Sequence, residues 1–391
     1  MEWNYVNEKL AQITDYPFQK LAKLLDGINP GGDVLFMSIG EPQHKAPALV
    51  GEALGKALHL WGKYPPVGAS PEFKQAVKGW LDRRFGLNPA LVQEKNIIPV
   101  AGTREALYMV AGLVVPEHKR GEKPVVLIPN PFYQVYAGAA IMAGAEPIFV
   151  TATVENGFMP DYKNLPEDIL RRTVLAYICS PSNPQGGVAS FQQMQEYLAL
   201  AMKYNFVLAS DECYSEIYGE TPPVSALQVA DSLDTAPLLV FHSLSKRSNV
   251  PGLRSGFVAG NSGLVDAFTR LRSYAGAVLP LPIVEASIAL WNDEEHVKET
   301  RALYRAKFDM AKKELNITPP PASFYLWLEV ENGEKAAQAL WRAAGIRVLP
   351  GAYLARSDAN GENPGDKFIR IALVHDLPTT EIALRTIAKV L

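Results

Sequence analysis

Between about residue 45 and residue 275, short apolar runs alternate along the chain with longer stretches of helical periodicity. The apolar runs are continuous, which is typical of strands that are covered on both faces of a sheet. We predict buried strands over residues 125–129, 147–150, 174–178, 206–210 and 238–243. The segment 191–204 predicts a helix between two of them. Such alternation predicts right-handed crossovers and a mostly parallel, doubly wound sheet.

The pattern changes after about residue 280. A long polar helix pattern covers residues 285–315, and a helix near 334–344, short apolar segments and a final helix follow it. This mixture predicts a second, smaller α+β domain, and we expect an amphipathic helix near 17–26 to pack against it. The predicted class is therefore α/β, with a large domain over residues 36–284 and a small domain formed by residues 1–35 and 285–391.

Composition narrows the classes of function. Apolar residues make up 48% of the chain and charged residues 20%, and 38 basic residues nearly balance 41 acidic ones. This balance points neither to nucleic acid nor to a membrane surface as a partner. The two cysteines form neither a disulfide framework nor a zinc pattern. We therefore expect that the protein binds no metal and that it works in a reducing compartment. Without a signal peptide or a long apolar span, the chain is predicted to be cytoplasmic.

Polar residues follow several of the predicted strands, and ligands in open α/β sheets bind at the carboxyl ends of strands. Residues of this kind occur in four places: Ala101-Gly102-Thr103-Arg104-Glu105, Ser180-Pro181-Ser182-Asn183-Pro184, Asp211-Glu212-Cys213-Tyr214 and Ser243-Leu244-Ser245-Lys246. Each segment alone has an ordinary explanation, such as a solvated lysine, a helix cap or a turn. Their occurrence at neighbouring strand ends makes one shared site the better interpretation.

The chemistry of these residues is coherent. The Gly102-Thr103-Arg104 segment offers free N–H groups at a helix start, where an anion is favoured. Ser243, Ser245 and Arg254 can converge on the same anion, close to the amine of Lys246. Asp211 could pair with a cationic ring nitrogen, Asn183 could donate to a ring oxygen, and Tyr133 could stack on the ring. Pyridoxal phosphate needs such a phosphate clamp, amine, buried carboxylate and aromatic ring.

The order and spacing of three motifs carry a family resemblance. They read SPSNPQG, DECY and SLSKRSNVPGLRSG in this chain. The chain resembles the fold-type I pyridoxal-phosphate aminotransferases of class I/II over essentially its whole length. Further segments, among them YPFQKLAKLL, SIGEPQH, NPFYQVY and FYLWL, are most similar to the proteobacterial N-succinyl-diaminopimelate aminotransferases.

The resemblance implies catalytic roles for three residues. Lys246 would form the Schiff base with the cofactor and would shuttle a proton between the substrate Cα and the cofactor C4′ carbon. Asp211 would pair with the ring nitrogen and keep it protonated. Tyr214 would hydrogen-bond the phenolic oxygen of the cofactor together with Asn183; ordinary core packing is the alternative for Tyr214.

The resemblance also implies a phosphate site. Thr103 and Arg104 would bind the phosphate through backbone N–H groups, together with Ser243, Ser245 and Arg254. Tyr133 would stack on the ring, although core packing explains its position almost as well. Tyr64 matches a family position that reaches the phosphate of the neighbouring subunit, which implies a homodimer with shared active sites.

The substrate end is implied in the same way. Arg370, in FIRIALV, matches the arginine that binds the substrate α-carboxylate through its guanidinium fork. Gly40 matches a backbone contact to the same carboxylate, and Asn183 is a further candidate for substrate binding. Tyr16 to Phe18 lie where N-terminal residues of the family close over the substrate. We interpret Arg247, next to the predicted Schiff-base lysine, as part of a surface ion pair.

The resemblance therefore implies a transaminase that moves an amino group from N-succinyl-LL-2,6-diaminopimelate to 2-oxoglutarate in lysine biosynthesis. An aspartate-, aromatic- or acylornithine-type aminotransferase and a C–S lyase on the same scaffold remain open alternatives. A regulator without turnover would carry a DNA-binding helix-turn-helix domain, and the aminotransferase pattern begins too early in the chain to leave room for one.

Overall fold

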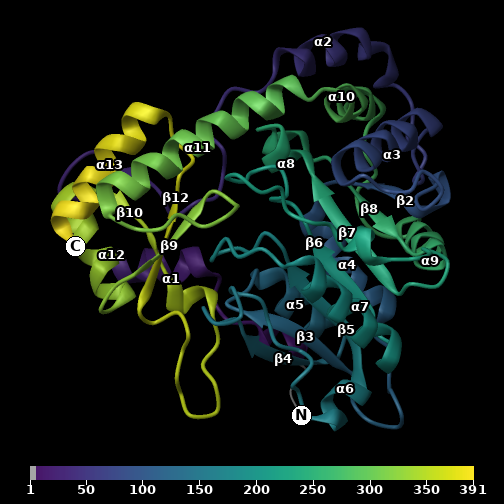
Figure 1. The fold of residues 1–391 in the computed structure, drawn as a ribbon, viewed down its shortest axis with the longest axis horizontal. Helices are drawn as coiled ribbons and strands as arrows, with labels where there is room; N and C mark the ends of the chain where they lie inside the picture. Colours follow the sequence, from purple (N-terminus) through teal and green to yellow (C-terminus); the bar gives the residue numbers. More distant parts are fainter. Residues whose placement is uncertain (1–5) are drawn as a thin grey trace.

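A computed structural model describes residues 6–391 of the chain. A sheet of seven strands forms its centre (Figure 1). In spatial order the strands are β2 (Ile97–Val100), β8 (Gly256–Gly260), β7 (Leu238–Ser243), β6 (Val207–Asp211), β5 (Thr173–Cys179), β3 (Val125–Asn130) and β4 (Glu146–Thr151). Only β8 runs antiparallel to its neighbours, so the prediction of a mostly parallel sheet is confirmed.

Helices cover both faces of this sheet, as the continuous apolar runs predict. In β3, Val125 and Leu127 pack into the hydrophobic cluster on one face, and Val126 and Ile128 pack into the cluster on the other. The first face is covered by α2 (Ala48–Lys56), α3 (Pro71–Phe85), α6 (Glu167–Arg172), α7 (Phe191–Tyr204) and α10 (Leu281–Asn292). The second face is covered by α4 (Thr103–Val114), α5 (Gln134–Met142) and α9 (Ser262–Arg272).

The remaining elements gather beside the large sheet around a separate hydrophobic cluster (Figure 1). They form a two-stranded sheet, β1 (Leu35–Phe36) with β10 (Ile346–Arg347), and a three-stranded antiparallel sheet, β11 (Leu349–Pro350), β12 (Phe368–Ala372) and β9 (Tyr325–Glu329). The helices here are α1 (Pro17–Leu25), α11 (Glu295–Leu315), α12 (Gly333–Ala344) and α13 (Leu377–Val390). The boundaries of the two predicted domains stay a prediction, and residues 1–5 of the small domain lie outside the described residues.

Helix α1 and the segment of α10 and α11 show where local sequence patterns succeed and fail. The amphipathic helix α1 buries Leu21 and Leu25 against Leu349 and Leu354, so its predicted packing against the smaller group of elements is confirmed. The single helix predicted over residues 285–315 is wrong. Helix α10 ends at Asn292 and α11 begins at Glu295, because the chain between them becomes extended at Asp293, whose carboxylate accepts a hydrogen bond from the N–H of His296 at 3.2 Å.

This arrangement determines where a site can form. Strands β5, β6 and β7 are parallel and end at Cys179, Asp211 and Ser243, so their last residues lie at one edge of the sheet. Strand β2 runs in the same direction, because both of its links to β7 through β8 are antiparallel. The N-terminus of α4 therefore starts at that same edge.

Candidate active site

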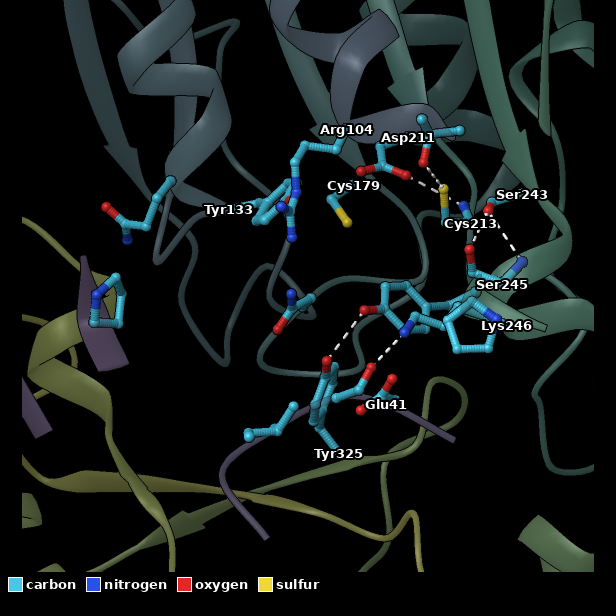
Figure 2. A pocket seen from close by; sticks show the side chains of 18 of the residues that line it. Glu41, Arg104, Tyr133, Cys179, Asp211, Cys213, Ser243, Ser245, Lys246 and Tyr325 are labelled. Carbon is cyan, nitrogen blue, oxygen red and sulfur yellow. Dashed lines mark hydrogen bonds between the residues drawn. The ribbon is translucent and has the colours of Figure 1, made fainter. Parts of the chain in front are cut away.

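A cavity of about 540 Å³ opens at the carboxyl edge of the large sheet, facing the smaller group of elements. Its size is typical of small-molecule sites. All the predicted site residues except Gly102 and Tyr64 line it: Tyr16, Gly40, Thr103, Arg104, Tyr133, Asn183, Asp211, Tyr214, Ser243, Ser245, Lys246, Arg254 and Arg370. Figure 2 shows part of this lining, with Asp211, Ser243 and Lys246 among the labelled side chains. The structure thus brings together residues more than 350 positions apart in the chain.

Lys246 projects into this cavity from α8 (Leu244–Arg247), a four-residue helix that begins directly after β7. Its amine donates a hydrogen bond to the carbonyl oxygen of Gly40 and lies 5.3 Å from the ring centroid of Phe324. Burial lowers the pKa of this amine to about 8. About a tenth of Lys246 is therefore uncharged at pH 7, far more than of an exposed lysine, and only the uncharged amine is a nucleophile.

Arg247, the next residue, belongs to a different environment. Its guanidinium pairs with Glu294 at 2.7 Å, donates to the carbonyl oxygen of Leu290 at 2.7 Å and lies 5.5 Å and 5.1 Å from the ring centroids of Trp80 and Trp291. The predicted ion pair exists, but its predicted place at the surface is wrong, because Arg247 is only 2% exposed. The short helix turns adjacent side chains in different directions, so Lys246 enters the cavity and Arg247 enters the core.

Asp211 ends β6 and forms part of the cavity wall. One carboxylate oxygen accepts a hydrogen bond from the hydroxyl of Tyr136 at 2.6 Å, and the other accepts one from the N–H of Cys213 at 3.2 Å. Burial raises the pKa of Asp211, while these hydrogen bonds oppose that effect. The carboxylate is thus placed to meet a cationic group in the cavity.

Groups suited to an anion surround the start of α4. Gly102 precedes the helix with a φ of +88°, and no side chain caps the first N–H groups. A β-carbon at Gly102 would lie 2.0 Å from Nη2 of Arg254, so only glycine allows the guanidinium to approach. Ser243 donates to the hydroxyl of Ser245 at 3.0 Å on the same side of the cavity. Helix N–H groups, hydroxyls and a guanidinium together suit a phosphate.

Arg370 reaches the cavity from β12 of the three-stranded sheet. It donates to the side-chain oxygen of Asn183 at 2.8 Å and to the carbonyl oxygen of Ser38 at 2.6 Å, and it lies 4.3 Å from the ring centroid of Tyr325. Its Nε has no partner among the described residues, and no carboxylate lies within 4.0 Å of it there. A buried guanidinium without a counterion provides a site for a carboxylate.

Two tyrosines form the wall between Lys246 and Arg370. The hydroxyls of Tyr214 and Tyr325 lie 3.2 Å apart, and burial raises the pKa of Tyr214 well above its usual value. A β-carbon at Gly40 would lie 1.8 Å from the hydroxyl of Tyr325, which explains why glycine occupies this position. The backbone of Gly40 is therefore held close to the amine of Lys246.

Arg104 and Tyr133 lie at another part of the cavity (Figure 2). Arg104 donates through Nε to the hydroxyl of Tyr133 at 2.9 Å, and this contact raises the pKa of Arg104. No carboxylate within the described part of the chain lies within 4.0 Å of the Arg104 guanidinium. Tyr16 also lines the cavity, at the start of α1, with 38% of its surface exposed.

Tyr64 is not part of the cavity. It lies in the loop before α3 and is fully exposed, at 102% of the reference surface. Its predicted contact with a neighbouring subunit stays a prediction. Gly102 lies next to the lining residue Thr103, at the turn into α4.

Several lining residues were not predicted from the sequence. They are Glu41, Phe132, Gln134, Cys179, Cys213, Pro251, Gly252, Tyr325, Leu349 and Leu354, with Ile39 beside Gly40. Glu41 follows Gly40 directly, and Cys213 lies between Asp211 and Tyr214, so their adjacency to predicted residues was an available signal. Leu349 and Leu354 carried no such signal, because they reach the cavity only through the packing of α1 against the three-stranded sheet.

Residues 6–391 carry neither a metal-binding cluster nor a membrane-spanning helix. These residues contain no group of three or more His, Cys, Asp or Glu side chains that could hold a metal ion. None of the helices in this range is long and apolar enough to cross a membrane.

Comparison with known proteins identifies the family. The model of the aminotransferase class I and II family matches residues 32–387. The chain is 32% identical to an LL-diaminopimelate aminotransferase of Desulforudis audaxviator, over 96% of this chain and 94% of that protein. Its structure is similar to that of an aminotransferase from Neisseria meningitidis, with a TM-score of 0.92 and 42% identity over 98% of this chain and 99% of that one. It is also similar to aminotransferase AspB from Helicobacter pylori, with a TM-score of 0.89 and 37% identity over 96% of this chain and 98% of that one.

The chain therefore belongs to the class I and II aminotransferases, and it has the fold-type I architecture predicted from the sequence. Members of this family are transaminases that use pyridoxal phosphate. The cavity fits that cofactor on three observations: a glycine that admits Arg254 to the helix start, a buried carboxylate at Asp211, and a lysine amine whose pKa burial lowers to about 8.

Proposed function

We propose that this aminotransferase moves an amino group from N-succinyl-LL-2,6-diaminopimelate to 2-oxoglutarate, forming 2-succinylamino-6-oxopimelate and glutamate. The observation that carries this proposal is the guanidinium of Arg104, which lines the cavity without a carboxylate partner among the described residues. Arg254 and Arg370 are assigned to the phosphate and to the α-carboxylate. A further cation favours a substrate with an additional carboxylate.

The cofactor end of the cavity determines the chemistry. When bound, pyridoxal phosphate supplies an aldehyde carbon that takes up the amino group and a ring that withdraws electrons from the substrate Cα. We assign Lys246 to the covalent attachment of the cofactor at rest and to proton transfer between Cα and C4′ during the reaction. We assign Asp211 to the ring nitrogen, because an ionised carboxylate at that position keeps the nitrogen protonated.

The phosphate belongs at the start of α4 in this proposal. The N–H groups of Thr103 and Arg104 are free to bind it, because no side chain caps the helix. Ser243, Ser245 and Arg254 complete the group, and Gly102 allows Arg254 to approach. Tyr133, which lines the same cavity, is assigned to stacking on the cofactor ring.

The α-carboxylate belongs at Arg370. Asn183 accepts a hydrogen bond from Arg370 through its oxygen, which leaves its amide nitrogen free to donate to the phenolic oxygen of the cofactor. Tyr214 is assigned to the same oxygen as a second donor. The backbone of Gly40, beside the amine of Lys246, is assigned to the substrate carboxylate.

The distribution of charge favours the acylated donor. The carboxylates that line the cavity in the described chain are Asp211 and Glu41. Glu41 lies on the Lys246 side of the cavity (Figure 2). Its charge opposes the lowering of the pKa of Lys246. Glu41 is not among the groups that raise the pKa of Arg104. A distal ammonium near Arg104 would meet no carboxylate, whereas a succinyl group supplies an uncharged amide and an additional carboxylate. Tyr16 would close over this arm.

The second candidate donor is LL-diaminopimelate itself. Relatives at 32% identity, including one from Aquifex aeolicus that matches 96% of this chain and 96% of its own length, are named LL-diaminopimelate aminotransferase. The two donors share the reacting end and differ in whether the distal nitrogen is charged. Whether the enzyme discriminates between the two donors is therefore a direct test of the proposed role of Arg104.

A comparison of donors tests this function. The half-reaction should be followed with each donor in the absence of 2-oxoglutarate, because the distal carboxylate of the acceptor would also meet Arg104. We expect N-succinyl-LL-2,6-diaminopimelate to react more efficiently than LL-diaminopimelate and far more efficiently than leucine. Arg104→Gln should lower the rate constant for the succinylated donor about 10- to 100-fold and leave that for leucine unchanged. A wild-type preference for unacylated LL-diaminopimelate would overturn the proposed donor.

We also propose that the enzyme is a homodimer in which Tyr64 completes the phosphate site of the partner subunit. Tyr64 is fully exposed, and the large apolar side chains of Leu58 and Trp61 near it in the chain are more than half exposed. Exposed apolar residues in one segment favour an interface. Mixing Lys246→Ala with Tyr64→Ala should give hybrid dimers with one intact site and more activity than either parent; no gain would contradict a shared site.

We also propose a cytoplasmic location. Both cysteines are free thiols, which fits a reducing compartment. Fractionation of the producing cells tests it, and recovery of the enzyme outside the cytoplasm would contradict it.

A further inference from the structure

The carboxylate of Asp211 is supported from behind by a residue that does not line the main cavity. Tyr136 lies in α5 and is completely buried. Its hydroxyl donates to Oδ2 of Asp211 at 2.6 Å, a distance typical of a hydrogen bond between a neutral hydroxyl and an ionised oxygen. The sequence motif NPFYQVY contains both Tyr133 and Tyr136, and the sequence assigned a role to Tyr133 alone.

Tyr136 is itself held in place by a second buried tyrosine. Its ring stacks on that of Tyr177, with centroids 4.5 Å apart and planes inclined by 12°. The hydroxyl of Tyr177 donates to the carbonyl oxygen of Leu107 at 2.7 Å. Leu107 belongs to α4, whose first residues form the proposed phosphate site. A continuous chain of contacts therefore links the phosphate end of the site to Asp211.

No strong counterion stabilises the charge of Asp211 within the described chain. The titratable groups around it are Tyr133, Tyr136, Cys179, Cys213 and His242, and no lysine or arginine lies within 4.0 Å. Burying a carboxylate without a counterion is costly, so its hydrogen bonds decide whether it stays ionised. Asp211 accepts two hydrogen bonds, and the one from the Tyr136 hydroxyl is the shorter.

The proton of this hydrogen bond belongs to the tyrosine. Burial and the adjacent carboxylate raise the pKa of Tyr136 well above its usual value. Tyr136 therefore remains a hydrogen-bond donor at neutral pH, and it is not among the residues that line the main cavity.

We propose that Tyr136 is a positioning residue, whose hydroxyl keeps Asp211 ionised and oriented toward the ring nitrogen of the cofactor. This inference rests on the proposed role of Asp211 and deepens it. Removing the hydroxyl while keeping the ring preserves the stack on Tyr177 but leaves the buried carboxylate with one hydrogen bond fewer. The carboxylate should then become neutral more easily and pair less strongly with a cationic ring nitrogen.

The test compares two ligands and two variants. The ligands are pyridoxal phosphate and an analogue in which the ring nitrogen is replaced by C–H, each titrated into the apoprotein. The variants are Tyr136→Phe and its matched control Tyr177→Phe, which removes a hydroxyl from the same buried stack without touching Asp211. We expect Tyr136→Phe to weaken the binding of pyridoxal phosphate about 10- to 100-fold. It should not weaken the binding of the analogue, and Tyr177→Phe should affect both ligands alike and only slightly.

Each other outcome is decisive. If Tyr136→Phe weakens both ligands equally, or weakens neither, Tyr136 does not act through the ring nitrogen and the inference is wrong. If Tyr177→Phe reproduces the selective loss, the effect belongs to the stack and not to the Tyr136 hydroxyl. If the wild-type protein binds both ligands equally, the proposed role of Asp211 fails instead. Melting temperatures of both variants confirm that each protein is folded in the titrations.

Discussion

The two ends of the active-site cavity are built in different ways. At the cofactor end, Asp211 and Ser243 terminate the adjacent strands β6 and β7, whose hydrogen-bonded register fixes their separation. At the substrate end, Arg370 comes from a separate three-stranded sheet, Gly40 from the segment after β1, and Tyr16 from the start of α1. Several hydrogen bonds connect the first two of these segments, such as those from Arg370 to the carbonyl oxygen of Ser38 at 2.6 Å and from the N–H of Ala372 to the carbonyl oxygen of Met37 at 2.7 Å.

This difference separates chemistry from selectivity. One cooperative sheet holds the groups assigned to the cofactor, so their geometry cannot change without disturbing the core. The groups around the substrate come from separate segments of the chain, and one side chain among them can be altered while the others stay in place. Substitutions at the cofactor end should therefore abolish the reaction, whereas substitutions at the substrate end should change which substrate is used and how well it binds.

The largest effect is expected from Lys246→Ala. The variant loses both the covalent attachment and the proton carrier, so we expect kcat to fall by about 10⁴-fold or more. The fold should persist, because the side chain lies in the cavity and not in the core. Single-turnover kinetics with the cofactor added in excess checks this. Activity within tenfold of the wild type would show that another group moves the proton.

The next effect is expected from Arg370→Lys. Lysine keeps the positive charge but lacks the planar fork that binds a carboxylate with two hydrogen bonds. We expect kcat/KM to fall about 100-fold for the donor and for 2-oxoglutarate, on the order of 3 kcal/mol, and the affinity for the cofactor to stay unchanged. Steady-state kinetics and a cofactor titration measure the two effects. An equal loss in both would mean that the two ends of the cavity are not separable.

The capture of the cofactor by the apoprotein should depend on pH. Burial lowers the pKa of Lys246 to about 8, and the uncharged amine is the reactive form. The capture rate should therefore rise about tenfold per pH unit below pH 8 and level off above it. An exposed lysine would keep gaining reactivity up to about pH 10.4. Stopped-flow absorbance against pH distinguishes the two, and a rate still rising steeply at pH 10 would contradict the buried amine.

The smallest effect is expected at Lys307, beneath the substrate end. This buried lysine donates to the carbonyl oxygen of Leu373 and to His44, each at 2.8 Å, and so ties the strand of Arg370 to the segment of Gly40. Burial lowers the pKa of Lys307 to about 7, below the value of 10.5 for an exposed lysine. Between these values the folded state binds fewer protons than the unfolded state, so the contribution of Lys307 to stability rises with pH.

Lys307→Met removes that pH dependence. Below pH 7 the wild type bears the full cost of a buried charge, so the melting temperature of the variant relative to the wild type should be higher at pH 6 than at pH 9, by roughly a few degrees. Loss of the two hydrogen bonds of Lys307 lowers the melting temperature of the variant at both pH values. A difference that is the same at pH 6 and pH 9 would show that Lys307 does not titrate in this range.

The cofactor end could be predicted from the sequence because its residues follow consecutive buried strands. Lys246, Asp211 and Asn183 each come within a few residues of a continuous apolar run, and parallel strands bring such positions to one edge. The fold class follows from the same alternation.

The substrate end was less accessible to sequence analysis. Tyr325 reaches the cavity because β9 pairs with β12, a long-range contact that no local pattern encodes. The burial of Arg247 depends on Trp80 and Trp291, which come from α3 and α10, two other elements of the chain. The break between α10 and α11 was missed because helical periodicity continues through Asp293 and Glu294. In each case tertiary packing determined the structure.

The central claim is that Lys246 carries the cofactor at the carboxyl edge of the large sheet. Reduction of the cofactor-loaded enzyme with borohydride, followed by proteolysis and mass spectrometry, tests it most directly, because reduction makes the linkage permanent. We predict one pyridoxyl group per chain, on the peptide that contains Lys246. A stable adduct on any other lysine, or none on a protein loaded with cofactor, would contradict the claim.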